Sequence, residues 1–207
     1  PLTVSSSHVY KAVTEDECEF NKLTVTSDTY YLAEVNVMAR IIRDQEWVME
    51  ISDDGSCDVS TARLVEDTLD YYAQDMTGNI WYFGENTWAW DDETGQCTSA
   101  GSWEAGKPVG DPEIDPAQPG IVMLAMPKRG DRYRQEFLED EAEDMAAVLR
   151  LNASVLIELG EFSNCLVTKE WTPLEPGGIE HKHYCLTPGT NGMGSGLVLI
   201  KELKGKT

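Results

Sequence analysis

The sequence is poor in basic residues and contains only three histidines. Its 207 residues carry 16 Lys and Arg against 37 Asp and Glu, which gives a formal net charge of −21 and a pI of about 4.3. A surface this acidic repels polyanions, so we expect neither nucleic acid nor anionic lipid as a partner. The charge is typical of a strongly solvated protein from a saline or extracellular setting, and it also attracts cations.

Long apolar runs are absent as well. The longest uncharged apolar stretch, around residues 121–127, is far shorter than the roughly 20 residues of a membrane-spanning helix. A chain that begins at Pro1 without Met fits a mature protein whose leader has been removed. We therefore expect an exported protein (periplasmic, cell-surface or extracellular) with no membrane span.

No two cysteines have the C-x-x-C spacing of a zinc finger or a thioredoxin-like site. In an exported protein the five cysteines predict up to two disulfides and one free thiol. Cys57 and Cys97 lie in Gly-containing turns, and Cys165 and Cys185 lie on candidate strands. The predicted pairs are Cys57–Cys97 and Cys165–Cys185, which leaves Cys18 free.

Most of the recognisable sequence patterns are typical of β-strands. Residues 22–42 are rich in Thr, Val, Tyr and Ile, and residues 46–52 alternate between apolar and polar faces. Residues 69–85, "LDYYAQDMTGNIWYFGE", form two alternating arms around Asp75–Asn79. Gly78 suits a turn, whereas Met76 and Thr77 interrupt the ligand spacing of an EF-hand calcium loop, so a hairpin is favoured over an ion site.

Two segments have less regular patterns. Residues 91–120 contain four prolines and several glycines, which predicts a long loop, and Trp103 suggests that part of it packs against the protein. Residues 139–150 have apolar residues at helical spacing, yet they could also run as a strand into "NASVLIEL". The pattern alone leaves helix and strand open.

Several ordered motifs resemble a widespread family of exported bacterial proteins. They are "YYAQDMTGNIWYFGE", "GSWEAG", "PGIVM", "MPKRGDRYRQEF", "EAEDMA" and "TKEWTPLEPGGIEHKHY", within residues 64–200. The C-terminal half is also similar to secreted β domains that form curved antiparallel sheets or half-barrels. Here "HYCLTPGTNGMGSG" replaces the usual "YYAPGVG", and residues 1–60 match poorly. The resemblance implies an exported all-β domain, supplies no activity, and favours strand at 139–150.

Metal ligands are the first candidate chemistry. On a strand, "EHKHYC" places His181, His183 and Cys185 on one face, and Met193 follows in a Gly-rich loop. Imidazole nitrogens suit copper or zinc, and a thioether suits Cu(I). The acidic residues within 139–144 could hold calcium. The competing interpretations are two surface histidines beside a disulfide and a solvated acidic face.

Aromatic stacking is the second candidate. Exposed on one face of a sheet, tryptophans form a platform for sugar rings or line an apolar cavity, whereas buried ones belong to the core. The candidates are Trp81, Trp88, Trp90 and Trp103. Catalysis has weaker support, because Ser195 in "GMGSG" lacks the spacing of a nucleophile elbow.

We therefore predict a single exported domain over 1–207, with a curved antiparallel sheet or open barrel and no assigned cofactor. Its expected role is non-enzymatic binding of a small ligand or a cell-surface component, or structural work at the cell surface. The alternatives are a metal-binding protein (copper, zinc or calcium), an assembly subunit that pairs through residues 1–10, and a hydrolase.

Overall fold

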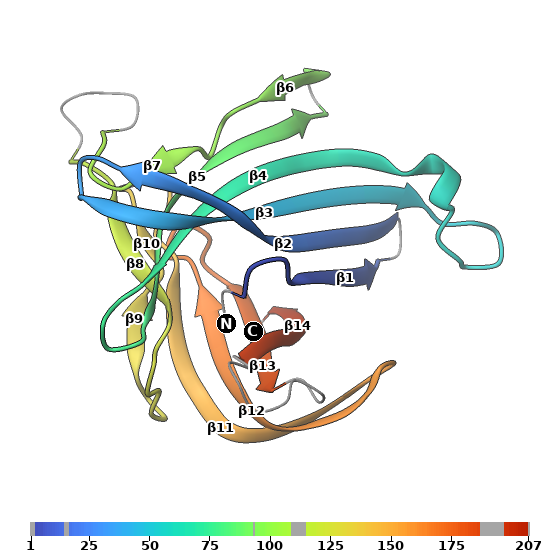
Figure 1. The fold of residues 1–207 in the computed structure, drawn as a ribbon. Helices are drawn as coiled ribbons and strands as arrows, with labels where there is room; N and C mark the ends of the chain where they lie inside the picture. Colours follow the sequence, from blue (N-terminus) through green and yellow to red (C-terminus); the bar gives the residue numbers. More distant parts are fainter. Residues whose placement is uncertain (1–2, 15–16, 93, 109–114, 187–196, 207) are drawn as a thin grey trace. The chain divides into compact units, whose positions relative to one another are not determined.

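The computed structural model describes residues 3–14, 17–92, 94–108, 115–186 and 197–206, and most of these lie in strands (Figure 1). Among them the only helix is a short 3₁₀ turn, Val59–Thr61. The longer sheet curls into a half-barrel of seven strands, so the predicted all-β fold with a curved antiparallel sheet is confirmed. Within these ranges no helix has the length and hydropathy needed to cross a membrane.

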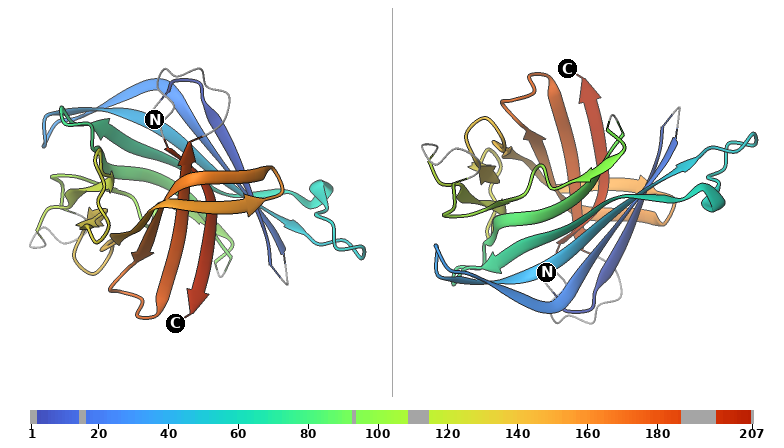
Figure 2. Two further views of the ribbon diagram at one scale, coloured as in Figure 1. Left: turned by 90° about the horizontal axis from the view of Figure 1, so that it is seen from below. Right: turned by 90° about the horizontal axis from the view of Figure 1, so that it is seen from above.

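The longer sheet is a succession of antiparallel neighbours. Its hydrogen-bonded path contains β1 (Ser7–Val13), β2 (Glu17–Leu32), β3 (Val37–Glu50), β4 (Arg63–Gln74), β5 (Ile80–Asp91), β8 (Gln118–Met123) and β10 (Glu136–Phe137). Two short strands, β6 (Gln96–Thr98) and β7 (Trp103–Glu104), pair with β5 off this path. Strands β1 to β4 lie side by side in the further views (Figure 2).

The second sheet has five strands in the order β14-β13-β12-β11-β9. They are β9 (Arg132–Arg134), β11 (Met145–Ile157), β12 (Gly160–Trp171), β13 (Gly178–Leu186) and β14 (Leu197–Lys206). The chain divides into two compact units: unit 1 comprises residues 1–3, 73–83 and 105–207, and unit 2 comprises residues 4–72 and 84–104.

Alternation along β3 gives the unit 2 sheet two different faces. Ile41, Arg43, Gln45, Trp47 and Met49 point to one face, which we call the groove face. Ile42, Asp44 and Glu46 point to the other, which we call the acidic face. The sequence alternation at 46–52 therefore holds in the structure, with Trp47 and Met49 on one side and Glu46 and Glu50 on the other.

A bulge in β2 interrupts this regular pairing. Val25 pairs with Ile42 and Thr29 with Arg40, so residues 26–28 stand opposite Ile41 alone. The Arg40 guanidinium donates to the backbone carbonyls of Ser27 (2.7 Å) and Asp28 (3.2 Å). Bulges change the direction of side chains beside binding sites, and this one is fixed by side-chain hydrogen bonds.

Residues 75–79 in unit 1 form the predicted hairpin turn. The Asp75 N–H donates to the Asn79 carbonyl and the Gly78 N–H donates to the Asp75 carbonyl, both at 3.0 Å. The Asp75 carboxylate accepts from Thr77, Asn79 and the Trp81 indole, and these hydrogen bonds hold its pKa well below the usual range. The carboxylate therefore orders the turn.

The second sheet settles the helix-or-strand question at 139–150. Residues 139–141 lie in an exposed turn in which Asp140 has φ of 61°, and β11 begins at Met145. Ala146, Ala147 and Val148 are buried in β11. The strand alternative is correct because pairing with β12 and β9 buries these residues, and tertiary packing overrides local helical spacing.

One predicted disulfide is confirmed and the other is wrong. Cys165 and Cys185 lie opposite each other on β12 and β13 and are bonded. Cys57 pairs with Cys18 instead of Cys97, which is a free, exposed cysteine on β6. Cys57 sits beside β3, whereas β6 follows β4 and β5 in the pairing order. At about 4.8 Å per strand, Cys97 is too far away to reach it.

The described part of the segment at 91–120 contains strands where the sequence predicted a loop. It supplies β6, β7 and the start of β8, and Trp103 is only 4% exposed. Its approach to β5 explains one glycine: Gly84 has φ of +124°, and a Cβ there would lie 2.3 Å from the Trp103 carbonyl oxygen.

Candidate functional site

An open groove of about 610 Å³ lies in unit 2, and residues of the groove face form its floor. Its lining residues are Thr26, Asp28, Ile41, Arg43, Leu64, Asp67, Leu69, Asn86, Thr87 and Trp88. They come from β2, β3, β4 and β5, and the bulge in β2 contributes Thr26 and Asp28. The groove thus combines apolar side chains with amide, hydroxyl, carboxylate and guanidinium groups.

A bidentate ion pair between Arg43 and Asp67 lies in this groove. The Arg43 Nε donates to Asp67 Oδ1 at 2.7 Å, and Arg43 Nη2 also contacts Asp67 Oδ2. The hydrogen bond to Asp67 raises the pKa of the Arg43 guanidinium, and Gln45 donates to the same carboxylate at 3.4 Å. The pair holds a planar polar group in one orientation on the floor of the groove.

The four predicted stacking tryptophans have different environments. Trp88 and Trp90 are two residues apart on β5, share a face, and are 39% and 37% exposed. Trp81 is half-buried and donates its indole N–H to Asp75 at 2.8 Å, and Trp103 is buried. The structure therefore leaves Trp88 and Trp90 as accessible ring faces, and Trp88 lines the groove.

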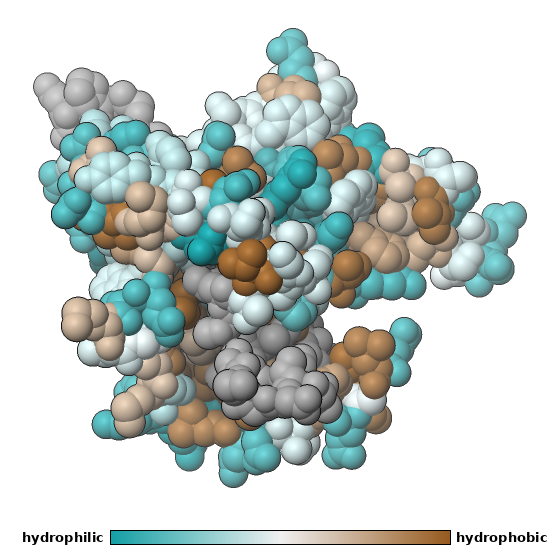
Figure 3. Space-filling view, viewed as in Figure 1, coloured by the Kyte–Doolittle hydropathy of each residue, from teal (hydrophilic) through white to brown (hydrophobic). Residues whose placement is uncertain are grey.

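A second hollow of about 210 Å³ continues along the groove face. Val9, Phe20, Trp47 and Met49 are among its lining residues. Apolar surface gathers over this end of β1, β2 and β3 in the space-filling view (Figure 3). From Ile41 to Met49 the strand rises about 26 Å at 3.3 Å per residue, so the two hollows form an extended surface.

The acidic face carries a half-buried carboxylate among like charges. Asn21 donates to Asp44 at 2.5 Å, while burial and the carboxylates of Glu46, Glu66 and Glu85 raise the pKa of Asp44 to about 7. Burial and Asp44 also raise the pKa of Tyr10 to about 12. The raised pKa of Asp44 follows from its partly desolvated position among other negative charges.

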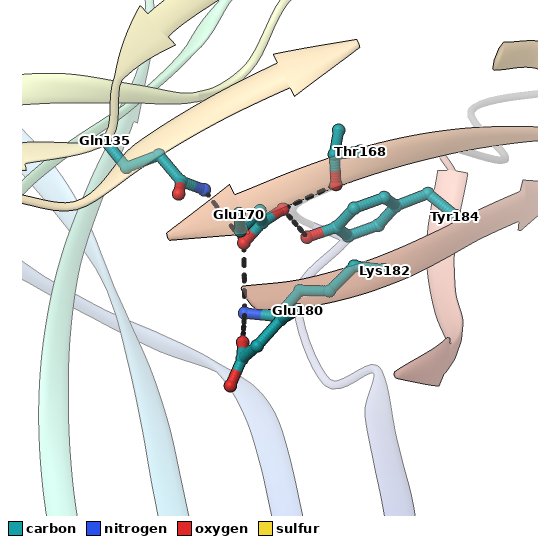
Figure 4. Close-up of polar contacts among 6 residues, drawn as sticks. All are labelled: Gln135, Thr168, Glu170, Glu180, Lys182 and Tyr184. Carbon is teal, nitrogen blue, oxygen red and sulfur yellow. Dashed lines mark hydrogen bonds and ion pairs between the residues drawn. The ribbon is translucent and has the colours of Figure 1, made fainter. Parts of the chain in front are cut away.

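Unit 1 has a buried polar network around Glu170 on β12 (Figure 4). The Glu170 carboxylate is 6% exposed and accepts from Thr168 (2.6 Å), Tyr184 (3.2 Å) and Gln135 (3.3 Å). Lys182 Nζ lies 3.0 Å from Glu170 and 3.3 Å from Glu180.

The Glu170 network joins three parts of unit 1. Thr168 and Glu170 lie on β12, Lys182 and Tyr184 on β13, and Gln135 between β9 and β10. Since two hydroxyls, an amide and an ammonium group already surround the carboxylate, the arrangement locks neighbouring strands together. We interpret it as a structural element.

The predicted metal ligands include two histidines on β13. His181 and His183 lie on one face of β13, and Cys185 is bonded to Cys165. Met193 and Ser195 lie outside the described residues. Among the residues that are described, no three His, Cys, Asp or Glu side chains form a group able to hold a metal ion. The metal site stays a prediction.

The N-terminal strand predicted for pairing with a neighbour has a partner within the chain. Residues Ser7–Val13 pair with β2 along their whole length, and β1 is an end of the strand order. The acidic residues Glu139, Asp140 and Glu141 are exposed, as expected for a solvated turn.

Sequence reasoning missed the Arg43–Asp67 pair. The two residues lie on different strands 24 positions apart, and β3 pairs Gln45 with Asp67 and Arg43 with Leu69. The sequence shows a basic and an acidic residue on two candidate strands. Only the register of these strands reveals that the two side chains are neighbours.

Comparisons with known proteins add no relative. No family model matches the chain, and neither the curated proteins nor the solved structures contain a significant match.

Proposed function

We propose that this chain is an exported, non-enzymatic binding protein whose ligand lies in the groove of unit 2. The supporting observation is an oriented ion pair, Arg43–Asp67, beside the half-exposed ring of Trp88 in one open groove. Binding sites typically combine apolar surface with a few fixed polar groups. The proposal therefore rests on groups that are already in place before a ligand arrives.

Export is supported by the cysteines. Two disulfides are consistent with an oxidising environment, in which such bonds form and persist. Mass analysis of natively purified, alkylated protein should show one modified thiol, at Cys97, and two disulfides. Five modified thiols in native protein would contradict export.

Ligand-observed NMR with a mixed library of sugars, aromatic acids, fatty acids and short peptides tests the binding role. We expect at least one class to bind the wild-type protein and to lose most of its saturation-transfer signal with Trp88→Ala. Leu156→Ala is the matched control, because it removes an exposed apolar side chain from unit 1. Library members should also be recovered unchanged after long incubation.

The proposal fails if no library member binds in a way that depends on Trp88. Turnover of a bound member would contradict the non-enzymatic part alone.

A further inference from the structure

The composition of the groove restricts the chemistry of its occupant. A fatty chain would cover Arg43, Asp67 and Asn86 with hydrocarbon, and burying such groups without hydrogen bonds costs free energy. The groove therefore suits a ligand that offers both hydrogen-bonding groups and an apolar face.

The charge of the groove also restricts the kind of ligand that it can bind. The three charged groups in the lining are Arg43, Asp67 and Asp28; the first two neutralise each other, and Asp28 leaves one negative charge. The chain as a whole carries −21. Anionic ligands are repelled at the groove and at long range, so an uncharged ligand fits better.

The geometry disfavours a peptide. Peptides that add a strand need an open sheet edge, whereas the groove lies on the face of β2, β3, β4 and β5, each of which pairs with neighbours on both sides. A sugar ring needs no edge, because its C–H face stacks on an indole and its hydroxyls bond to side chains in the ring plane.

From these observations we infer that the groove face of unit 2 binds a neutral oligosaccharide. Trp88 stacks against one ring, and the Arg43–Asp67 pair and Asn86 bond to its hydroxyls. Trp90, on the same side of β5, supplies a second ring face about 7 Å along the strand. The second hollow at Trp47 extends the surface beyond a single ring. This inference rests on the proposed binding role and names the class of ligand.

Titration calorimetry with neutral linear hexasaccharides tests the inference. The panel contains glucan, mannan, xylan and N-acetylglucosamine oligomers, together with an oligogalacturonate as the anionic comparison. We expect at least one neutral hexasaccharide to bind, the matching monosaccharide to bind at least ten-fold more weakly, and the oligogalacturonate to bind more weakly still.

Variants locate the site. Trp88→Ala should weaken binding about ten-fold, which corresponds to the loss of one aromatic contact, and Arg43→Met should weaken it several-fold. Leu156→Ala should change nothing. Circular dichroism of each variant shows that the sheet is intact.

Two results would overturn the inference in different ways. If no neutral hexasaccharide binds while another library class binds through Trp88, the ligand class is wrong and the binding role stands. If a hexasaccharide binds with equal affinity to wild-type protein and Trp88→Ala, the site is wrong.

Discussion

Each unit contains a desolvated carboxylate on a sheet, and the two differ in their charged neighbours: Glu170 has a lysine as well as Asp144 and Glu180 nearby, and Asp44 lies among carboxylates. Glu170 in unit 1 has an ammonium group at 3.0 Å and three neutral donors. Asp44 in unit 2 has one amide donor, Asn21, and three neighbouring carboxylates.

The difference shows how neighbours decide what a carboxylate does. Glu170 joins strands through its contacts to Thr168, Lys182, Tyr184 and Gln135, so losing a contact partner should destabilise unit 1. Asp44 is penalised when charged, so its ionisation should make the stability of unit 2 depend on pH.

The largest expected effect comes from removing the cation beside Glu170. Lys182→Met should lower the free energy of unfolding by about 2–4 kcal/mol, because a buried carboxylate loses its charged partner. Urea denaturation followed by circular dichroism measures this. Lys128→Met, on an exposed lysine, should cost less than about 0.5 kcal/mol. Equal losses of unfolding free energy in the two variants would contradict the structural role assigned to Glu170.

Asp44→Asn should raise the free energy of unfolding, and it should do so only at higher pH. The folded-state pKa of Asp44, about 7, lies above its ordinary value of 3.8. Stability from its protonated form is therefore fully present below pH 4 and declines as pH rises to 7. The amide resembles the protonated acid, so the variant should gain about 1–2 kcal/mol at pH 8, after allowance for solvent screening, and almost nothing at pH 4.

Unfolding free energies at pH 4, 6 and 8 test the Asp44 prediction. Glu34→Gln, at an exposed acid, should show no such pH-dependent gain. A destabilised Asp44→Asn variant at pH 8 would contradict the account of the acidic face.

One buried threonine in each unit donates to a glutamate on its own strand. Thr168 donates to Glu170 at 2.6 Å and Thr68 donates to Glu66 at 2.7 Å, and both threonines are buried. The Thr68 hydroxyl also lies 3.2 Å from the hydroxyl of Thr87, whose backbone bonds to the Ser102 hydroxyl. Thr168→Val should cost about 1.5–2 kcal/mol, since its acceptor is buried, and Thr68→Val about 0.5–1 kcal/mol. Thermal unfolding of the two variants compares them directly. The reverse ranking would mean that burial of the acceptor does not set the cost.

The smallest effect on stability is expected at the groove. Arg43 and Asp67 are partly exposed, and surface ion pairs contribute little to folding, so Arg43→Met should change the unfolding free energy by less than about 1 kcal/mol. Its effect should be on ligand binding. A loss of several kcal/mol would make the pair a structural element instead of a recognition element.

Sequence patterns predicted the β class and the turn at Asp75–Asn79, because these follow from local alternation and turn chemistry. The Cys165–Cys185 bond was also predicted, but only from the placement of both cysteines on candidate strands, since spacing does not fix connectivity. They could not predict the Cys18–Cys57 bond, since the order of strands in the sheet decides which cysteines are neighbours. The exposure of Trp88 against the burial of Trp103 also depends on how β7 packs against β5. The groove needed the register of β3 and β4, and short-range patterns do not carry register.

Binding of the ligand at the groove face of unit 2 is tested most directly by an indole NMR titration. The six tryptophan indole N–H resonances are assigned by substitution and followed while the best-binding neutral hexasaccharide is added. We expect large shifts of the Trp88 and Trp90 resonances, with those of Trp81 and Trp103 unchanged. Binding that shifts the resonance of Trp81 or Trp103 and leaves that of Trp88 unchanged would contradict binding at the groove face.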